Sequence, residues 1–164
     1  MDVTQLPFNR LVGLERGADD SEFLICLPDN PEYTNHLGTV HASALLAVAE
    51  AGSGAFLVRQ FGSGAKVVPV VRRLEAKFRK PARGRVSARC TVRAKEVERW
   101  SAELAARGRV LAPVSVEVVD AAAVVVLSAV VEWFIARAGE NAERGATADR
   151  PPDYGSSEFK SPSA

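Results

Sequence analysis

Glu50 is the residue whose surroundings in this sequence point most directly to chemistry. It is the only charged residue in the run His41–Val58, which is dominated by alanine and leucine. On a helix, none of the residues three or four positions away would carry a positive charge. A buried carboxylate without such a partner loses hydration, which costs free energy or raises its pKa. A carboxylate of this kind can act as a general base.

A structural role for Glu50 is the alternative. The alternation around Leu74 and Ala76 would place Arg72 on the same side of a strand as these apolar residues. A salt bridge from Arg72 to Glu50 would then neutralise the carboxylate. The sequence leaves both roles open and favours the base that faces a crevice, because perturbed carboxylates cluster at functional sites.

The segment before this run supplies groups that could act together with Glu50. Asn35 and Gly38 mark a loop, and the chain enters a helix near His41. The first backbone N–H groups of that helix, those of Ala42–Leu45, have no carbonyl partner within it and point back toward the loop. Such groups stabilise negative charge that develops on an oxygen. A side-chain amide, a helix N-terminus and a carboxylate together suit the attack of water on a carbonyl.

The spacing of these residues resembles the motif of a known superfamily. The run Asn35-x-x-Gly38-Thr39-x-His41, followed nine residues later by Glu50, looks like the motif of the hotdog-fold acyl-CoA thioesterases of the phenylacetate-pathway type. The stretch Phe78–Gly84 is similar to the end of the third strand in that family. The resemblance spans roughly residues 10–137, and the inserted segment 98–107 resembles a hotdog branch without a characterised activity.

The resemblance implies a role for each residue of the motif. Glu50 would activate water or attack the thioester directly, and Asn35 would orient the water or the substrate. The backbone N–H of Ala42 would polarise the thioester carbonyl. His41 would position the loop and contact the thioester.

The same motif departs from the family at two points. Family members carry two glycines after the histidine, where this chain has Ala42 and Ser43, so the N–H donors remain but each Cβ narrows the approach. Gly38 and Ser43 would line the substrate path. Some members also use a hydroxyl group of the third strand, and residues 66–80 contain no serine or threonine. Both departures bear on turnover more than on binding.

Four basic residues cluster around one predicted turn: Arg79, Lys80, Arg83 and Arg85. Such a cluster suits the phosphates of coenzyme A, and a solvated strand end is the alternative. The resemblance favours phosphate binding. The substrate it implies is an acyl-CoA or an acyl-carrier thioester.

The elements that must position these groups can be inferred from periodicity. Two short strands, Leu11–Glu15 and Glu22–Leu27, would form a hairpin, and a long helix with no polar side would follow from His41. Alternation with a period of two then predicts three strands, and a run that is apolar on both sides predicts a fourth. A short helix at Glu98–Arg107 that ends at Gly108 would interrupt them. These strands fall at residues 66–80, 85–95, 110–118 and 124–135.

Pro113 and the last strand carry further information. Proline cannot donate to a sheet, so Pro113 predicts an edge or a bulge in its strand. Residues 124–135 are apolar on both sides, which predicts that both faces of that strand are covered. A dimer with the sheets side by side would supply some of that cover.

Together the elements predict an α+β class with the hotdog fold, in which one long central helix is wrapped by a curved antiparallel sheet of five to six strands. Residues 1–137 would form this domain and residues 138–164 a polar, flexible C-terminal tail. The expected assembly is a homodimer or a dimer of dimers.

Composition excludes several classes of function. The 164 residues carry a net charge of +1, which argues against nucleic-acid or membrane binding by bulk charge. We expect no apolar run long enough to span a membrane. Cys26 and Cys90 form no disulfide framework, which fits the cytoplasm. With His36 and His41 as the only histidines, neither a metal nor another cofactor is expected.

Three functions remain in view. The first is an acyl-CoA thioesterase with Glu50 as base. The second is a non-catalytic acyl-CoA binding protein. The third is a hotdog 3-hydroxyacyl dehydratase, because His36 precedes Glu50 by 14 residues, although the Leu37-Gly38 that follows does not match the Phe-Pro-Gly of those enzymes.

Overall fold

The computed structural model describes residues 1–19, 21–62 and 67–138. The predicted tail, apart from Ala138, lies outside the described residues. The elements are η1 (Val3–Gln5), α1 (Pro7–Val12), β1 (Glu15–Arg16), β2 (Ile25–Leu27), η2 (Pro31–Tyr33), α2 (Ala42–Phe61), β3 (Val67–Phe78), β4 (Val86–Cys90), α3 (Ala94–Arg107), β5 (Arg109–Val119) and β6 (Val125–Arg137).

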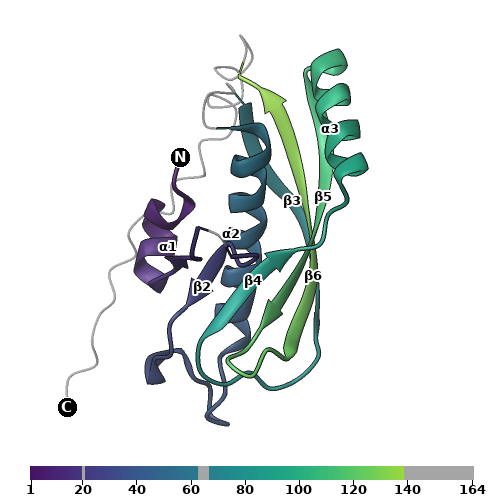
Figure 1. Ribbon diagram of the computed structural model, residues 1–164. Coiled ribbons are helices and arrows are strands. Elements are labelled where there is room, and N and C mark those ends of the chain that lie inside the picture. Colours follow the sequence, from purple (N-terminus) through teal and green to yellow (C-terminus); the bar gives the residue numbers. More distant parts are fainter. Residues whose placement is uncertain (20, 63–66, 139–164) are drawn as a thin grey trace, which may run out of the picture.

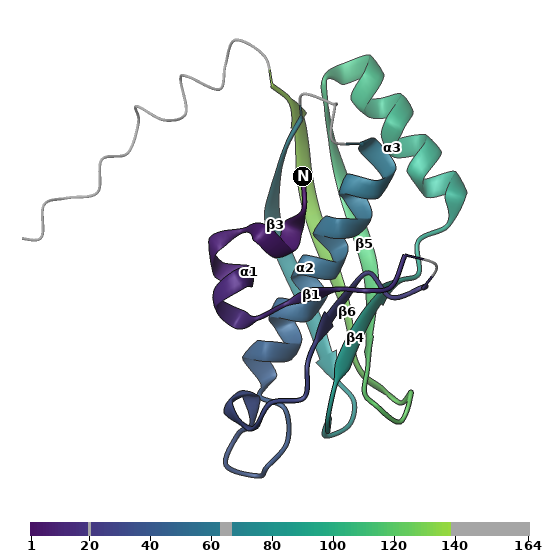
Figure 2. The ribbon, with the colours of Figure 1, turned by 60° about the vertical axis from the view of Figure 1, so that its left-hand side comes forward.

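In the described part of the chain, six strands form one antiparallel sheet in the order β1-β2-β4-β5-β6-β3. Helix α2 lies along one face of this curved sheet and α1 lies beyond it, so that α2 stands between α1 and the sheet (Figure 1). Turning the molecule shows α3 beyond the C-terminal part of α2, over the start of β5 (Figure 2). The predicted α+β class, with one long helix wrapped by a curved antiparallel sheet, is confirmed.

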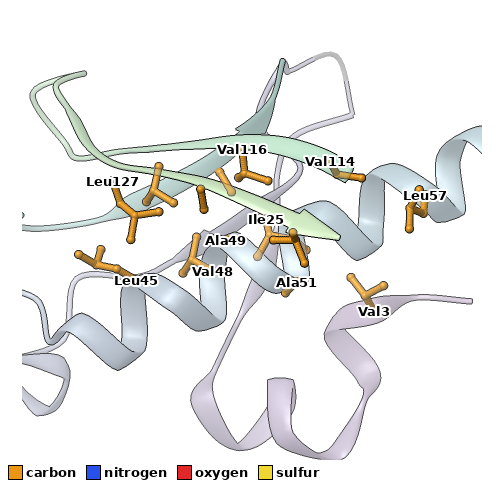
Figure 3. Close-up of a cluster of buried hydrophobic side chains, with 14 of the residues drawn as sticks. Val3, Ile25, Leu45, Val48, Ala49, Ala51, Leu57, Val114, Val116 and Leu127 are labelled. Carbon is orange, nitrogen blue, oxygen red and sulfur yellow. The ribbon is translucent and has the colours of Figure 1, made fainter. Parts of the chain in front are cut away.

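Helix α2 supplies one side of the core. Leu45, Val48 and Leu57 are buried against the sheet, and Figure 3 shows them pointing toward apolar side chains of the strands. The helix approaches β4 closely at Gly52, because a Cβ there would lie 2.7 Å from the Cβ of Ala88. The opposite side of α2 is only partly covered within one chain. The expectation of a helix buried on all sides is therefore not met by a single chain.

By length and composition alone α2 could cross a membrane, with 20 residues and a mean hydropathy of 1.3. The charged residues Glu50 and Arg59 lie within this helix, so the expectation that no uninterrupted apolar run has this length still holds. Core helices of soluble proteins pass the same test, and α2 packs along the sheet in that way. Its apolar composition is explained by that packing.

The predicted N-terminal strand Leu11–Glu15 is wrong. Residues 7–12 form helix α1, with Pro7 at its first position and Gly13 in the left-handed conformation (φ 73°) at its end. Proline fixes a helical φ where no N–H bond is needed, and glycine tolerates the left-handed cap. The first strand is reduced to Glu15–Arg16, which pairs with the last part of the predicted partner strand.

The predicted strand 85–95 and helix 98–107 meet at a different boundary. Strand β4 ends at Cys90, and α3 begins at Ala94 because Arg93 and Glu96 cap its first turn. Trp100 and Leu104 lie four residues apart on α3, and both are buried. The short alternating run after Cys90 is therefore no strand: residues 91–93 connect β4 to α3, and Ala94 and Lys95 begin the helix.

Part of β5 has a free edge, and one face of β6 is partly exposed. Pro113 lies in the part of β5 that has no β4 partner, since that pairing begins only at Val116, so the predicted edge is present at this point. In β6 the residues alternate between buried and partly exposed, and Val130 is 38% exposed. One face of β6 thus lacks cover within one chain, and the expected cover from a second subunit stays a prediction.

Candidate active site

Glu50 lies in the third turn of α2 and lines an apolar cavity of about 440 Å³. The cavity is bounded by the N-terminal segment, by α2 and by the adjoining parts of β3 and β6. Burial raises the pKa of the Glu50 carboxyl above its ordinary value. The side chain therefore faces a crevice, as expected for a base with a perturbed pKa.

The alternative, in which Arg72 neutralises Glu50, is wrong. Within residues 1–19, 21–62 and 67–138, no cation forms an ion pair with Glu50. Arg72 is exposed and sits where the pairing of β3 with β6 shifts register, between Val71 and Arg73. This irregularity breaks the alternation that placed Arg72 beside Leu74.

The amide of Asn35 holds its own loop together. Its Oδ1 accepts hydrogen bonds from the backbone N–H of Leu37 (2.9 Å) and Thr39 (3.3 Å), and its Nδ2 donates to Oγ1 of Thr39 (3.0 Å). Gly38 adopts the left-handed conformation (φ 66°) that the loop requires. Asn35 thus shapes the loop that leads into α2, and any contact with substrate would come in addition to these bonds.

His41 caps α2 and leaves one backbone donor free. Its Nδ1 accepts from the N–H of Ser43 (3.1 Å), and its carbonyl accepts from Ala44 (3.0 Å) and Leu45 (3.2 Å). Of the four N–H groups expected to be free, only that of Ala42 has no acceptor among the described residues. The structure therefore narrows the candidate oxyanion donor to Ala42.

One chain does not bring the loop and the carboxylate together. Eight residues separate Ala42 from Glu50 on α2, which is about 12 Å at 1.5 Å per residue. Asn35, His41 and Ala42 do not line the cavity of Glu50. His36 is exposed on the loop and does not line it either, so the pairing of His36 with Glu50 that a dehydratase needs is not formed within one chain.

The four basic residues of the predicted turn do not converge. Arg79 donates to Ser128 (2.7 Å), and Arg85 forms an ion pair with Glu15 (2.9 Å). Arg83 donates to the carbonyl of Gly38 (3.3 Å), which ties this turn to the loop before α2. The side chain of Lys80 has no partner among the described residues, and its backbone N–H donates to Val126. Their shared contact with phosphate stays a prediction.

Three residues near Glu50 were not singled out from the sequence. Trp133 donates from Nε1 to Oγ of Ser53 (2.9 Å), and Ser53 donates to the carbonyl of Glu50 (2.7 Å). Ser53 follows Glu50 by three residues, a helical spacing that could have identified it. No local signal links Trp133 or the N-terminal Val3 to this cavity, because both reach it only through the tertiary fold.

The two cysteines are structural. Cys26 is buried in β2, and burial raises the pKa of the Cys90 thiol to about 12, so little thiolate forms at neutral pH. Across the described part of the chain, no group of three or more metal-ligating side chains gathers at one place.

Comparison with known proteins identifies a family and a fold. A family model described as a domain of unknown function, DUF4442, matches residues 15–135. No curated protein matches the chain. A protein of unknown function from Pseudomonas aeruginosa, described as a probable thioesterase, matches with a TM-score of 0.70 and 22% identity over 82% of this chain and 90% of its own.

Two further solved structures share the arrangement. A phenylacetic acid degradation-related protein from Ralstonia eutropha has a TM-score of 0.55 and 18% identity over 79% of this chain and 90% of its own. A protein from Bacillus halodurans solved with CoA has a TM-score of 0.58 and 18% identity over 78% and 74%. At these identities the likeness shows the fold, which is the hotdog fold of thioesterases.

Proposed function

The chain belongs to the DUF4442 family, and on that premise we propose that it is a hydrolase of acyl-CoA or acyl-carrier thioesters. One observation carries the proposal: Glu50 is desolvated, lacks a cation among the described residues and lines an apolar cavity. A carboxylate in this setting is a stronger base than an exposed one. The hotdog fold and the related structure that contains CoA support the thioester class.

The reaction follows from the carboxylate. Glu50 takes a proton from a water molecule, and the resulting hydroxide adds to the thioester carbonyl carbon to give a tetrahedral oxyanion. The oxyanion collapses and the carbon–sulfur bond breaks. Glu50 then gives its proton to the sulfur of the leaving group. The products are a carboxylic acid and a thiol, and Glu50 is restored.

The oxyanion needs a donor, and the free N–H of Ala42 is the candidate in this chain. Within one chain this donor is about 12 Å along the helix from Glu50, too far for both to act on one carbonyl. We therefore place the complete site between two copies, with Glu50 of one chain facing the α2 N-terminus of the other.

Strand β3 is where the second copy would dock. It is the last strand of the sheet, and no described strand pairs with its outer edge. An unpaired edge of 12 residues that carries exposed valines is a ready template for another strand. Two β3 strands paired side by side would extend the sheet and set two α2 helices on the same face, which would cover the partly exposed side of each helix.

Lys80 and Arg83 are the remaining candidates for the phosphates of coenzyme A. One guanidinium N–H of Arg83 donates to the carbonyl of Gly38, and its other N–H groups remain available. Arg79 and Arg85 are bound by side chains of the sheet. The contact from Arg83 to the loop would couple phosphate binding to the position of the Ala42 donor.

The test is the release of thiol from a panel of acyl-CoA substrates by wild type and Glu50→Gln. We expect the variant to lose at least about a hundredfold in kcat, since general-base catalysis contributes on that order. Circular dichroism and sedimentation of the variant check that fold and assembly are kept. Unchanged rates in a folded variant would refute the proposal.

A non-catalytic acyl-CoA binding protein is the second candidate. Two observations favour it: the amide of Asn35 is engaged within its loop, and β3 carries no hydroxyl side chain. Saturable binding of acyl-CoA without thiol release, unaffected by Glu50→Gln, would support this candidate and exclude hydrolysis.

A further inference from the structure

The cavity that contains Glu50 is closed on one side by the N-terminal segment. Met1, Val3, Leu6 and Asn9 line it from within residues 1–9, opposite residues of α2, β3 and β6. Val3 is buried, and Figure 3 shows its side chain directed toward α2 beside Ala51 and Leu57. The N-terminal segment, residues 1–9, therefore forms one wall of this cavity.

Val3 also separates this cavity from a second one. A cavity of about 600 Å³ lies between the N-terminal segment, the β1–β2 hairpin and α2. Met1, Val3 and Val58 line both cavities and so form the boundary between them. Removing the side chain of Val3 would open one cavity toward the other.

Side-chain hydrogen bonds within the N-terminal segment hold it in its conformation. Asn9 is buried, and its Nδ2 donates to the carbonyl of Val3 (2.8 Å). The carboxylate of Asp2 accepts from the backbone N–H (3.0 Å) and hydroxyl (2.8 Å) of Thr4, which fixes the turn of η1. Val3 is thus held in place at the boundary.

Gly54 defines the width of the cavity below Val3. A Cβ on Gly54 would lie 3.6 Å from Cζ2 of Trp133 and 3.9 Å from Cγ1 of Val3, which is ordinary contact. Trp133 cannot swing aside freely because its indole N–H is bonded to Ser53. A side chain larger than methyl at position 54 would therefore fill space that glycine leaves open.

We propose that this cavity binds the acyl group and that Val3 and Gly54 select acyl chains of medium length. The inference rests on the proposed function, because Glu50 marks the end of the cavity at which the thioester would react. A volume of about 440 Å³ holds at most about fifteen groups of about 30 Å³ each, and a flexible chain in an irregular cavity stays below that limit. Acetyl would leave most of the cavity empty, palmitoyl lies at or beyond the limit, and we take medium length to be about eight to twelve carbons.

The test compares kcat/KM for acyl-CoA substrates from acetyl to palmitoyl in wild type, Val3→Ala and Gly54→Val. We expect an optimum at medium length in wild type. Val3→Ala should move the optimum to longer chains, and Gly54→Val should lower the rate with decanoyl-CoA about tenfold or more while sparing butyryl-CoA. A merely structural role would lower all lengths alike. Leu11→Ala, which changes an exposed residue outside both cavities, is the matched control.

A binding measurement separates this inference from the proposed function. If wild type hydrolyses no acyl-CoA, the proposed hydrolysis fails, and the same length series is then measured by displacement of a fluorescent fatty acid with free fatty acids. A preferred chain length that becomes longer in Val3→Ala and shorter in Gly54→Val would uphold the inference in either assay. Three results would overturn it: equal activity or binding with acetyl and palmitoyl chains, no displacement at any length, or a preferred length that neither variant changes.

Discussion

At the scale of single residues, the buried carboxylate of Glu50 lowers the free energy of unfolding, and the same burial makes it a stronger base. Burial raises its pKa above the ordinary 4.5, and no described cation offsets the lost hydration. Enzymes often keep such groups because a base with a raised pKa is more effective near neutral pH. The hydrolysis proposed above should therefore rise with pH through the raised pKa of Glu50.

We expect Glu50→Gln to raise the free energy of unfolding at neutral pH. Between pH 4.5 and the raised pKa, the folded state holds more protons than the unfolded state, so wild-type stability falls as the pH rises. Glutamine does not titrate, and this fall should disappear. Urea unfolding from about pH 4 to about pH 8 measures both effects.

The control for this series is Glu98→Gln. Glu98 is exposed on α3 and forms no ion pair among the described residues. Its variant should keep the wild-type dependence on pH. If Glu50→Gln also kept it, the carboxylate would not be desolvated in solution.

His41 should contribute to stability through its cap. His41→Ala removes the acceptor for the N–H of Ser43, and we expect a loss of about 1 kcal/mol in the free energy of unfolding. His41→Asn supplies another side-chain acceptor and should recover most of it. His36→Ala, at an exposed position of the same loop, should change nothing in the same urea titration. Equal stability of all three variants would contradict the capping role.

At the scale of elements, two glycines of α2 serve different purposes. Gly52 lets the helix touch β4, whereas Gly54 leaves room beside Trp133. Both lie in a helix interior, where glycine is less favourable than alanine. Their packing environments, and not their propensities, distinguish them.

Gly52→Ala and Gly54→Ala should therefore change stability in opposite directions. The Cβ of Ala88 cannot move without its strand, so Gly52→Ala should cost about 1–2 kcal/mol after the gain in helix propensity. Gly54→Ala meets only ordinary contacts and should stabilise by about 0.5–1 kcal/mol. Thermal unfolding of the two variants measures the difference, and a shift of the same sign in both would contradict the packing argument.

At the scale of the whole molecule, the sheet ends at β3, whose outer edge pairs with no described strand, and α2 is only partly covered. Val70 on β3 and Leu111 on β5 both pair in register with Phe134 and are 49% and 51% exposed. They lie on the same face of the sheet, but only Val70 belongs to the edge strand. This pair of residues can distinguish docking at the edge from docking on the face.

We expect Val70→Glu to weaken the proposed dimer, because it sets a charge beside the free edge of β3 and removes apolar area that pairing would cover. Leu111→Glu should leave the dimer intact. Sedimentation velocity over a range of concentrations reports the assembly of each. Dissociation by Leu111→Glu alone would indicate assembly through the sheet face.

Local patterns in the sequence were enough for the elements that carry the core. The long run dominated by alanine and leucine predicted α2, the alternation of Val110–Val118 predicted β5, and the apolar run of residues 124–135 predicted β6. The same patterns failed where a few residues fit two structures. Residues 91–95 alternate like a strand, but the capped first turn of α3 makes Ala94 and Lys95 helical and leaves 91–93 outside any element. Residues 7–12 lack a clear period, and Pro7 at the first helical position favours the helix there.

The sequence by itself also determined that Glu50 lies in an apolar helix without a local cation, because charge and spacing along a helix are local properties. Only the tertiary structure decided what surrounds it. Its surroundings depend on residues far apart in the chain. Examples are the irregular pairing of β3 with β6 at Arg72, the hydrogen bond from Trp133 to Ser53, and Val3 in the wall of the cavity. Contacts at such separations depend on how the sheet curves around the helix, and no short stretch of sequence records that curvature.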